Sequence, residues 1–390
     1  MKINQFTLDN FKSFNDTNNR LSNVLNINYI YGENNSGKSN ILKFLKLIFS
    51  LKDDFSRDVL VEGEMLSPSS EKHFYSGTIQ NEPYIFHKNK RDKPIKYHFS
   101  INLKHAEIEN AGFGFYDKLN TGYFKKDRDE AHLEFEGIIK SIDNLSTSEI
   151  ILNKVQINKK PIFENKTKPE FFGGTSGTGD LKGNKLAFNS FIGYLGDITE
   201  YIDNNRYFKT EYYKQNDNIL EAGNFKNWLY NLSLNEFEFD KYLGLLEFIK
   251  KYKVDSLPVL SNLDLSFSIN PHNIIELLLD NESERLPISS FGTGVNQILY
   301  ILTRLYFSNA RIILIEELEL NLSPDTQREL LNILRLLIED DKIDQVFFTS
   351  HSDYFSFRQD ISIYKTSIDG NGVSKVESKK GASKIYFRGK

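Results

Sequence analysis

The chain contains no cysteine, which excludes disulfide bonds and thiolate metal sites and is compatible with the cytoplasm, where we expect the protein to act. No hydrophobic run approaches the length of a membrane span, and the first residues lack the apolar core of a signal peptide, so we expect no membrane partner. The long heptad array of a coiled-coil arm is also absent. The net charge of −4 excludes a chain that is basic throughout, but it is compatible with a local basic groove.

The strongest motif lies near the amino terminus. Gly32, Gly37, Lys38 and Ser39 fill the phosphate-loop pattern G-x-x-x-x-G-K-[ST]. An apolar run at 24–31 predicts a strand before the loop, and apolar residues at helical spacing predict a helix after it. In this arrangement backbone N–H groups and the helix N-terminus bind phosphates, Lys38 reaches the β- and γ-phosphates, and the Ser39 hydroxyl ligates Mg²⁺. The sequence therefore predicts a nucleotide site.

Two carboxylates follow a second apolar run, at 311–315. After a phosphate loop, Glu316 and Glu317 have the pattern of a Walker B strand, with the first near Mg²⁺ and the second polarising the attacking water. The alternative is a core strand that ends in a solvated acidic turn. A further predicted strand at 345–349 leads to His351, which either contacts the γ-phosphate and its water or is structural.

A glycine-bearing loop at 289–294 precedes a predicted helix at 298–307. Small residues at a helix start form a second anion-binding device, which we expect to cap the γ-phosphate held by another copy of the chain. A plain helix-capping turn is the alternative. Behind the predicted Walker B strand, Asp325 is expected to cap a helix that ends near Glu339.

The middle of the chain has a different pattern of apolar and polar residues. Short alternating runs between 53 and 168 predict an antiparallel β layer. The glycine-rich segment 171–184 is interpreted as a linker or lid rather than a second phosphate loop. Residues 188–252 are predicted to be mostly helical, with apolar residues including Ile198 and Ile202 on one face. The tail from 361 to 387 is predicted to form two or three short strands with a hairpin turn at 369–372.

The order of these parts resembles the ABC-type ATPases of the RecF, SMC and OLD-like group. The segment from Asn10 to Phe14 resembles the start of those proteins. The segment 291–295 stands where they carry the signature Leu-Ser-Gly-Gly-Gln, and 322–324 where many carry Leu-His-Pro. The resemblance covers the two ends of the chain and matches the middle only in outline.

This resemblance implies an α/β fold, a P-loop NTPase of the ABC-ATPase type with a mixed central sheet, an antiparallel β layer and a helical insertion. The implied division is an ATPase core at 1–52 and 255–390, a β-rich subdomain at 53–170 and a helical insertion at 185–254. Such heads sandwich two ATP molecules between two subunits, so a homodimer or higher homo-oligomer through the ATP sites is implied.

The resemblance also assigns roles. ATP would be bound by Gly32, Asn34, Asn35, Ser36, Gly37, Lys38, Ser39 and Asn40, with Thr293 and Gly294 as the contact from the other subunit. Ser39 and Glu316 would hold Mg²⁺, Glu317 would be the general base, and His351 the switch histidine. Three features depart from the family pattern. Gly292 replaces the signature serine, and Glu316 replaces the aspartate of Walker B. The glutamine of the Q-loop has no clear counterpart, and Gln156 is the candidate for it.

Partners are also implied by the resemblance. OLD-like nucleases carry a nuclease domain after the ATPase, but too few residues follow His351 to form one, so we expect no nucleic-acid cleavage by this chain alone. Stand-alone ATPases of this type resemble sensor subunits of bacterial anti-phage systems, which act with a separate effector or nuclease. The alternative is a RecF-like repair clamp that binds DNA through the basic pairs and runs at 88–91, 125–126 and 159–160. A transporter subunit is disfavoured.

Overall fold

The computed structural model describes residues 1–15, 19–49, 76–80, 84–104, 107, 130–141, 147–164, 170–171, 194–215, 220–252, 254–261, 263–281, 284–352, 355 and 360–379. They form two compact units. The first consists of Met1–Thr199 with Asp344–Lys390, and the second of Glu200–Ile343.

The first unit contains a large antiparallel sheet. Its strands have the order β2-β1-β5-β6-β7-β8-β9, and β4 pairs with β7. The bounds are β1 Lys2–Asp9, β2 Arg20–Leu21, β4 Ser76–Gln80, β5 Ile95–Lys104, β6 Glu130–Ser141, β7 Thr147–Ile157, β8 Lys160–Glu164 and β9 Glu170–Phe171. Every second residue of much of β5 is buried, as expected for a sheet with one face in the core. The predicted antiparallel β layer is therefore present.

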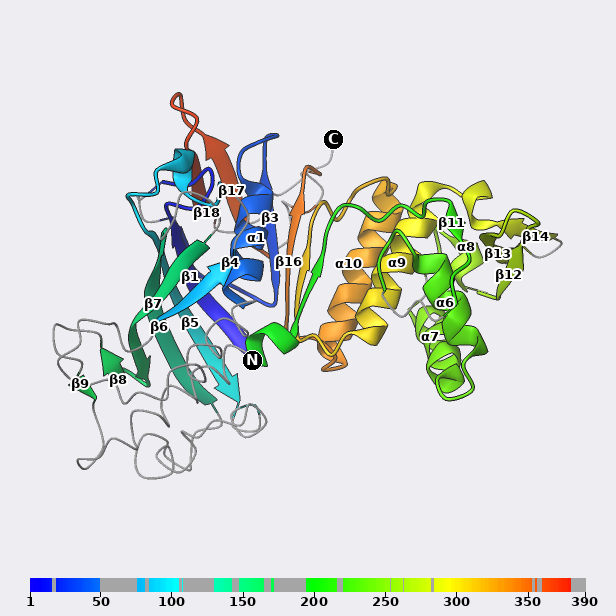
Figure 1. Cartoon of the computed structure of the whole chain (residues 1–390), viewed down its shortest axis with the longest axis horizontal. Helices are drawn as coiled ribbons and strands as arrows, with labels where there is room; N and C mark the ends of the chain where they lie inside the picture. Colours follow the sequence, from blue (N-terminus) through cyan, green and yellow to red (C-terminus); the bar gives the residue numbers. More distant parts are fainter. Residues whose placement is uncertain are drawn as a thin grey trace, which may run out of the picture. The chain divides into compact units, whose positions relative to one another are not determined.

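A second sheet in this unit carries the phosphate-loop strand. β3 (Ile27–Gly32) pairs in parallel with β16 (Gln345–Ser350) on one side and β17 (Ser362–Ile368) on the other, and β18 (Ser374–Lys379) pairs antiparallel with β17. Helix α1 (Lys38–Phe49) lies beside β3 and β16 (Figure 1). The predicted tail hairpin is confirmed as β17–β18.

Helix α1 packs on the antiparallel sheet through an aromatic cluster. Phe44 of α1 stacks on Phe6 of β1 at 6.5 Å and on Phe99 of β5 at 6.1 Å, and Phe99 stacks on Phe135 of β6 at 5.2 Å. All four rings are buried. Because burying each ring is worth about 1.5–3 kcal/mol, this cluster anchors the helix that begins at Lys38.

The second unit is mainly helical. Its strands are β10 (Thr199–Ile202), which neighbours β15 (Ile312–Ile315), and a small antiparallel sheet of β11 (Glu211–Tyr212), β12 (Leu265–Ile269), β13 (Ile274–Asn281) and β14 (Glu284–Pro287). Its helices are α6 (Phe225–Leu234), α7 (Phe239–Lys251), α8 (Pro258–Ser261), α9 (Thr293–Phe307) and α10 (Pro324–Glu339), with the 3₁₀ turn η3 (Ile288–Ser290) before α9. Figure 1 shows α9 and α10 side by side.

Two sequence predictions need correction. Helices α6 and α7 confirm the helical prediction for the second half of the segment 188–252. In its first half, one short helical turn is followed by strands β10 and β11, so Ile202 lies on a strand and not on a helix face. Pairing with β15 outweighs the helical spacing of the apolar residues. The cap of α10 is Ser323, whose hydroxyl accepts the backbone N–H of Thr326 at 3.2 Å, and Asp325 lies inside the helix behind Pro324.

The glycine-rich segment 172–184 and the basic pair at 125–126 lie outside the described residues. Among the helices that the structure describes, none is long and apolar enough to span a membrane.

Candidate functional site

The phosphate loop forms as the sequence predicts. Strand β3 ends at Gly32, a turn follows, and α1 begins at Lys38. Gly37 has a left-handed φ of 98°, and a Cβ on it would lie 2.7 Å from the Ser374 hydroxyl and 2.8 Å from that of Ser13. Only glycine fits this position, because both the conformation and the space exclude a side chain. Asn35 has a φ of 62°, a conformation that asparagine tolerates better than most residues.

Lys38 is buried and folded back over the loop that precedes it. Its ammonium donates to the carbonyl oxygens of Gly32 at 2.9 Å and Glu33 at 2.8 Å, and lies 3.5 Å from Nδ1 of His351. The structure thus brings together two predicted site residues that are far apart in sequence. The ammonium therefore donates to oxygen atoms of the loop, and phosphate oxygens would be acceptors of the same kind.

The loop is supported from behind by residues that the sequence analysis missed. The Ser36 hydroxyl is 2.6 Å from that of Thr366 on β17, and the Thr366 hydroxyl donates to the Tyr31 carbonyl at 3.1 Å. The Asn40 amide donates to the Ser13 hydroxyl at 2.8 Å. No local pattern could mark Thr366, because its role comes from the pairing of β17 with β3.

The remaining predicted loop residues differ in exposure. Asn34 and Asn35 are exposed and Ser39 is half-buried at the start of α1. Gln156, the candidate for the Q-loop, lies within β7, where its amide donates to Glu134.

In the second unit, the predicted acidic pair follows the fully buried strand β15. Glu316 is buried; its backbone N–H donates to the Ile202 carbonyl at 2.9 Å, and its carboxylate accepts the Tyr201 hydroxyl at 2.6 Å. Glu317 has a φ of 47°, a left-handed conformation that is uncommon for residues other than glycine. Such strain persists where the surrounding structure over-determines it.

Arg206 supplies that support. Its side chain is fully buried, and its Nη2 donates to the carbonyl oxygens of Glu316 at 2.8 Å and Glu317 at 2.7 Å. Among the described residues, its Nε and Nη1 have no hydrogen-bond partner. Burial lowers the pKa of Arg206 to about 10, against the opposing effect of nearby carboxylates, first that of Asp203. Sequence analysis missed Tyr201 and Arg206, because neither belongs to a motif that it used.

The glycine loop lies at the start of α9. Gly292 caps the helix with a φ of −59°, Gly292 and Thr293 are exposed, and Gly294 is half-exposed. A Cβ on Gly292 would meet nothing within 4 Å, so glycine is not required there by space. In the next turn of the helix, the Gln297 side chain is fully buried, and its two amide atoms have no partner among the described residues.

Comparison with known proteins identifies the family. The chain belongs to the AAA ATPase domain family, whose match covers residues 1–355. It is 24% identical over 368 residues to a protein of Helicobacter pylori (strain ATCC 700392 / 26695) named ATP/GTP phosphatase, covering 90% of this chain and 86% of that protein. The protein is therefore an ATPase, and the predicted ATPase activity and mixed α/β fold are confirmed.

Solved structures with a similar course of the chain include Smc heads. One is the Smc head bound to the C-winged helix domain of ScpA, with a TM-score of 0.47 and 14% identity, covering 97% of this chain and 98% of that chain. Another is the SMC head domain from Thermotoga maritima, with a TM-score of 0.42 and 12% identity, covering 97% of this chain and 99% of that chain.

Proposed function

We propose that the protein binds ATP with Mg²⁺ at the phosphate loop and hydrolyses it, and that ATP joins two copies of the chain. The observation that carries this proposal is the buried Lys38 ammonium, held between loop carbonyls and His351 at the N-terminus of α1. Phosphate oxygens can replace the carbonyls as acceptors, while the N-terminal N–H groups of the helix supply further donors.

The metal would be held largely by the nucleotide. Among the described residues, no group of three or more His, Asp or Glu side chains could hold an ion. Mg²⁺ commonly binds through one or two protein oxygens, the substrate phosphates and water. In this proposal the Ser39 hydroxyl and the Glu316 carboxylate would be those protein ligands, and the ion would supply positive charge to the phosphoryl group that is transferred.

Glu317 is proposed as the general base and His351 as the residue that contacts the γ-phosphate or its water. Arg206 acts as a positioning residue, since it holds the carbonyl groups of both Glu316 and Glu317 and thereby the turn that aims the second carboxylate. Tyr201 orients the Glu316 carboxylate through the 2.6 Å hydrogen bond.

Kinetics and binding test these assignments separately. Lys38→Ala should abolish ATP binding, measured by equilibrium binding of a fluorescent ATP analogue. Glu317→Gln should bind the analogue as the wild type does and lose hydrolysis by about 100-fold or more. Hydrolysis at the wild-type rate by Glu317→Gln would show that another residue is the base.

The loop at 292–294 is proposed to contact the nucleotide of the other copy, because Thr293 is exposed at the start of a helix of 15 residues. We further propose that closure of the dimer drives or gates a separate effector in anti-phage defence, which rests on the resemblance alone. We also propose the division of the chain that the sequence predicts: an ATPase core at 1–52 and 255–390, a β-rich subdomain at 53–170 and a helical insertion at 185–254. Deletion of the gene without any change in phage sensitivity would count against the defence role.

A RecF-like DNA clamp is the second candidate. It is favoured by the exposed side chains of Lys88 and Lys90 and of Lys159, which lie in two of the predicted basic segments. Binding of duplex DNA that strengthens with ATP and weakens with salt would support it, and no binding at low salt would remove it.

A further inference from the structure

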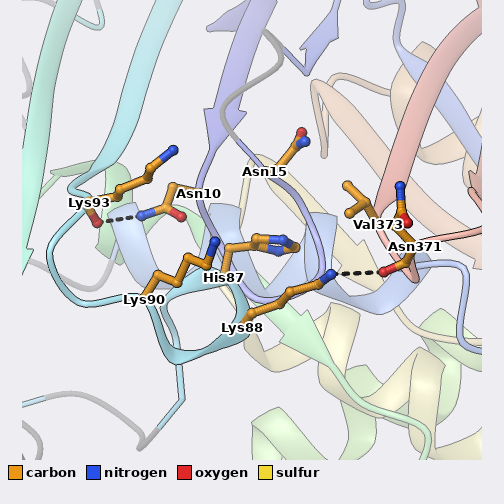
Figure 2. Close-up of a pocket in the computed structure, with 8 residues that line it drawn as sticks. All are labelled: Asn10, Asn15, His87, Lys88, Lys90, Lys93, Asn371 and Val373. Carbon is orange, nitrogen blue, oxygen red and sulfur yellow. Dashed lines mark hydrogen bonds between the residues drawn. The ribbon is translucent and has the colours of Figure 1, made fainter.

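The first unit contains a pocket lined mostly by residues with polar or positively charged side chains. Its volume is about 360 Å³, and Figure 2 shows the residues around it: Asn10, Asn15, His87, Lys88, Lys90, Lys93, Asn371 and Val373. These described lining residues include three lysines and neither aspartate nor glutamate. None of them belongs to the phosphate loop at 32–40, so this pocket is a separate feature.

Hydrogen bonds join the walls of the pocket. The backbone N–H of His87, in the 3₁₀ turn η1 (His87–Asn89), donates to the Asn10 carbonyl at 3.0 Å, and the His87 Nδ1–H donates to the Lys12 carbonyl at 3.0 Å. The Lys88 ammonium donates to the Asn371 carbonyl at 2.8 Å. Because His87 is also buried, three segments far apart in sequence are held as one concave surface.

Three lysine side chains carry the positive charge of the lining. The Lys88 ammonium is hydrogen-bonded to the turn that contains Asn371. Backbone N–H groups of this turn, first that of Val373, hold the pKa of Asp369 below its ordinary value, and the charge of Lys88 adds a weaker contribution. Lys90 and Lys93 are exposed on the opposite side of the pocket, as Figure 2 shows. A run of surface lysines is usually solvated, but these converge with carboxamide groups on a pocket of small-molecule size.

We infer that this pocket binds a phosphate-bearing anion, supplied either by a small phosphorylated compound or by the 5′-terminal phosphate of a single-stranded nucleic acid. Ammonium groups attract the phosphate charge, and the Asn10 amide, which donates to the Lys93 carbonyl, holds the wall that carries Lys93 in place. The small volume of the concave pocket favours a terminal phosphate over the side of a duplex, because a chain end or a small molecule fits a pocket of this size and a duplex does not.

The segment 10–15 lines the pocket with Asn10 and Asn15 and also supports the phosphate loop. The Ser13 hydroxyl accepts a hydrogen bond from the Asn40 amide. The Ser13 carbonyl accepts one from the backbone N–H of Ser374 at 2.9 Å. A ligand in the pocket and a nucleotide in the loop would therefore act on the same segment, and any coupling between them must be reciprocal. This coupling rests on the proposed nucleotide site; binding in the pocket does not.

The test uses the full-length Lys38→Ala protein, so that the phosphate loop does not contribute. Inorganic pyrophosphate is titrated by calorimetry, and a fluorescent single-stranded oligonucleotide, with and without a 5′-phosphate, is titrated by anisotropy. The pocket variant is Lys90→Gln/Lys93→Gln, whose side chains are exposed, so the fold is retained. The matched control is Lys104→Gln, an exposed lysine at the far end of β5, a strand roughly 30 Å long.

We expect the pocket variant to lose affinity by about tenfold or more and the Lys104→Gln control to retain it. Binding of pyrophosphate assigns the site to small compounds, and binding of the phosphorylated oligonucleotide alone assigns it to nucleic-acid ends. Equal binding of the two oligonucleotides without binding of pyrophosphate would overturn the inference, because neither form of the phosphate group would be recognised. The inference also fails if neither probe binds or if Lys90→Gln/Lys93→Gln binds as tightly as the control.

Discussion

Replacing Arg206 by methionine should damage catalysis much more than stability. The change removes two hydrogen bonds to the carbonyls of Glu316 and Glu317, worth about 3–6 kcal/mol together at about 1.5–3 kcal/mol each. It also removes two buried nitrogen atoms, Nε and Nη1, that have no hydrogen-bond partner among the described residues and cost about 1–3 kcal/mol each. The terms nearly cancel, so the free energy of unfolding should change by less than about 2 kcal/mol.

The catalytic effect follows from the backbone of Glu317. Its left-handed conformation costs about 1–3 kcal/mol and is held in part by Arg206, so loss of that support lets the turn relax. A shift of about 1 Å in the carboxylate lowers kcat by about 100-fold. KM for ATP should stay near the wild-type value, because the phosphate loop is unchanged.

The assay is steady-state ATP hydrolysis together with urea unfolding of the same preparations. Arg311→Met is the matched control. Arg311 lies just before β15, and its guanidinium donates to the Asp341 carboxylate at 2.8 Å and to the Asp341 carbonyl. We expect Arg311→Met to keep kcat. Arg206→Met with unchanged kcat, or with a loss of activity that only tracks unfolding, would refute the positioning role.

Three further predictions follow from particular contacts. Gly37→Ala should lose ATP binding and about 1–3 kcal/mol of stability, measured by nucleotide titration and thermal unfolding, because its Cβ would clash with Ser13 and Ser374; Gly223→Ala, where a Cβ meets nothing within 4 Å, is the control. Gly292→Ser should fold normally and raise the hydrolysis rate if the loop contacts ATP of the other copy, and a lower rate would contradict that contact. Backbone N–H groups of the β17–β18 turn hold the pKa of Asp369 below its ordinary 3.8, so the stability it contributes is present above pH 3.8 and is lost as the pH falls through the folded-state pKa. The difference in melting temperature between wild type and Asp369→Asn should therefore vanish in acid.

The parts of the site that could be predicted from sequence are those that contiguous residues define. The phosphate loop and the acidic pair after β15 each depend on one strand and the turn that follows it, so spacing alone indicates them. The antiparallel β layer that contains β5 can be predicted for the same reason, since alternation is a local signal.

What the sequence did not show depends on pairing between distant segments. Thr366 and Arg206 act through contacts with residues far along the chain, and neither stands in a recognisable motif. The spacing of Ile198 and Ile202 fits a helix as well as a strand, and only the neighbouring β15 decides between them. The cap at Ser323 could have been predicted from sequence, because proline is common at the first position of a helix and the residue before it is then the N-cap.

Sedimentation velocity of Glu317→Gln tests the central claim most directly. With ATP and Mg²⁺ this variant should sediment as a dimer, and without nucleotide, or with Lys38→Ala added, it should sediment as a monomer. A Glu317→Gln protein that stays monomeric at saturating ATP, or that still hydrolyses ATP at the wild-type rate, would contradict the claim.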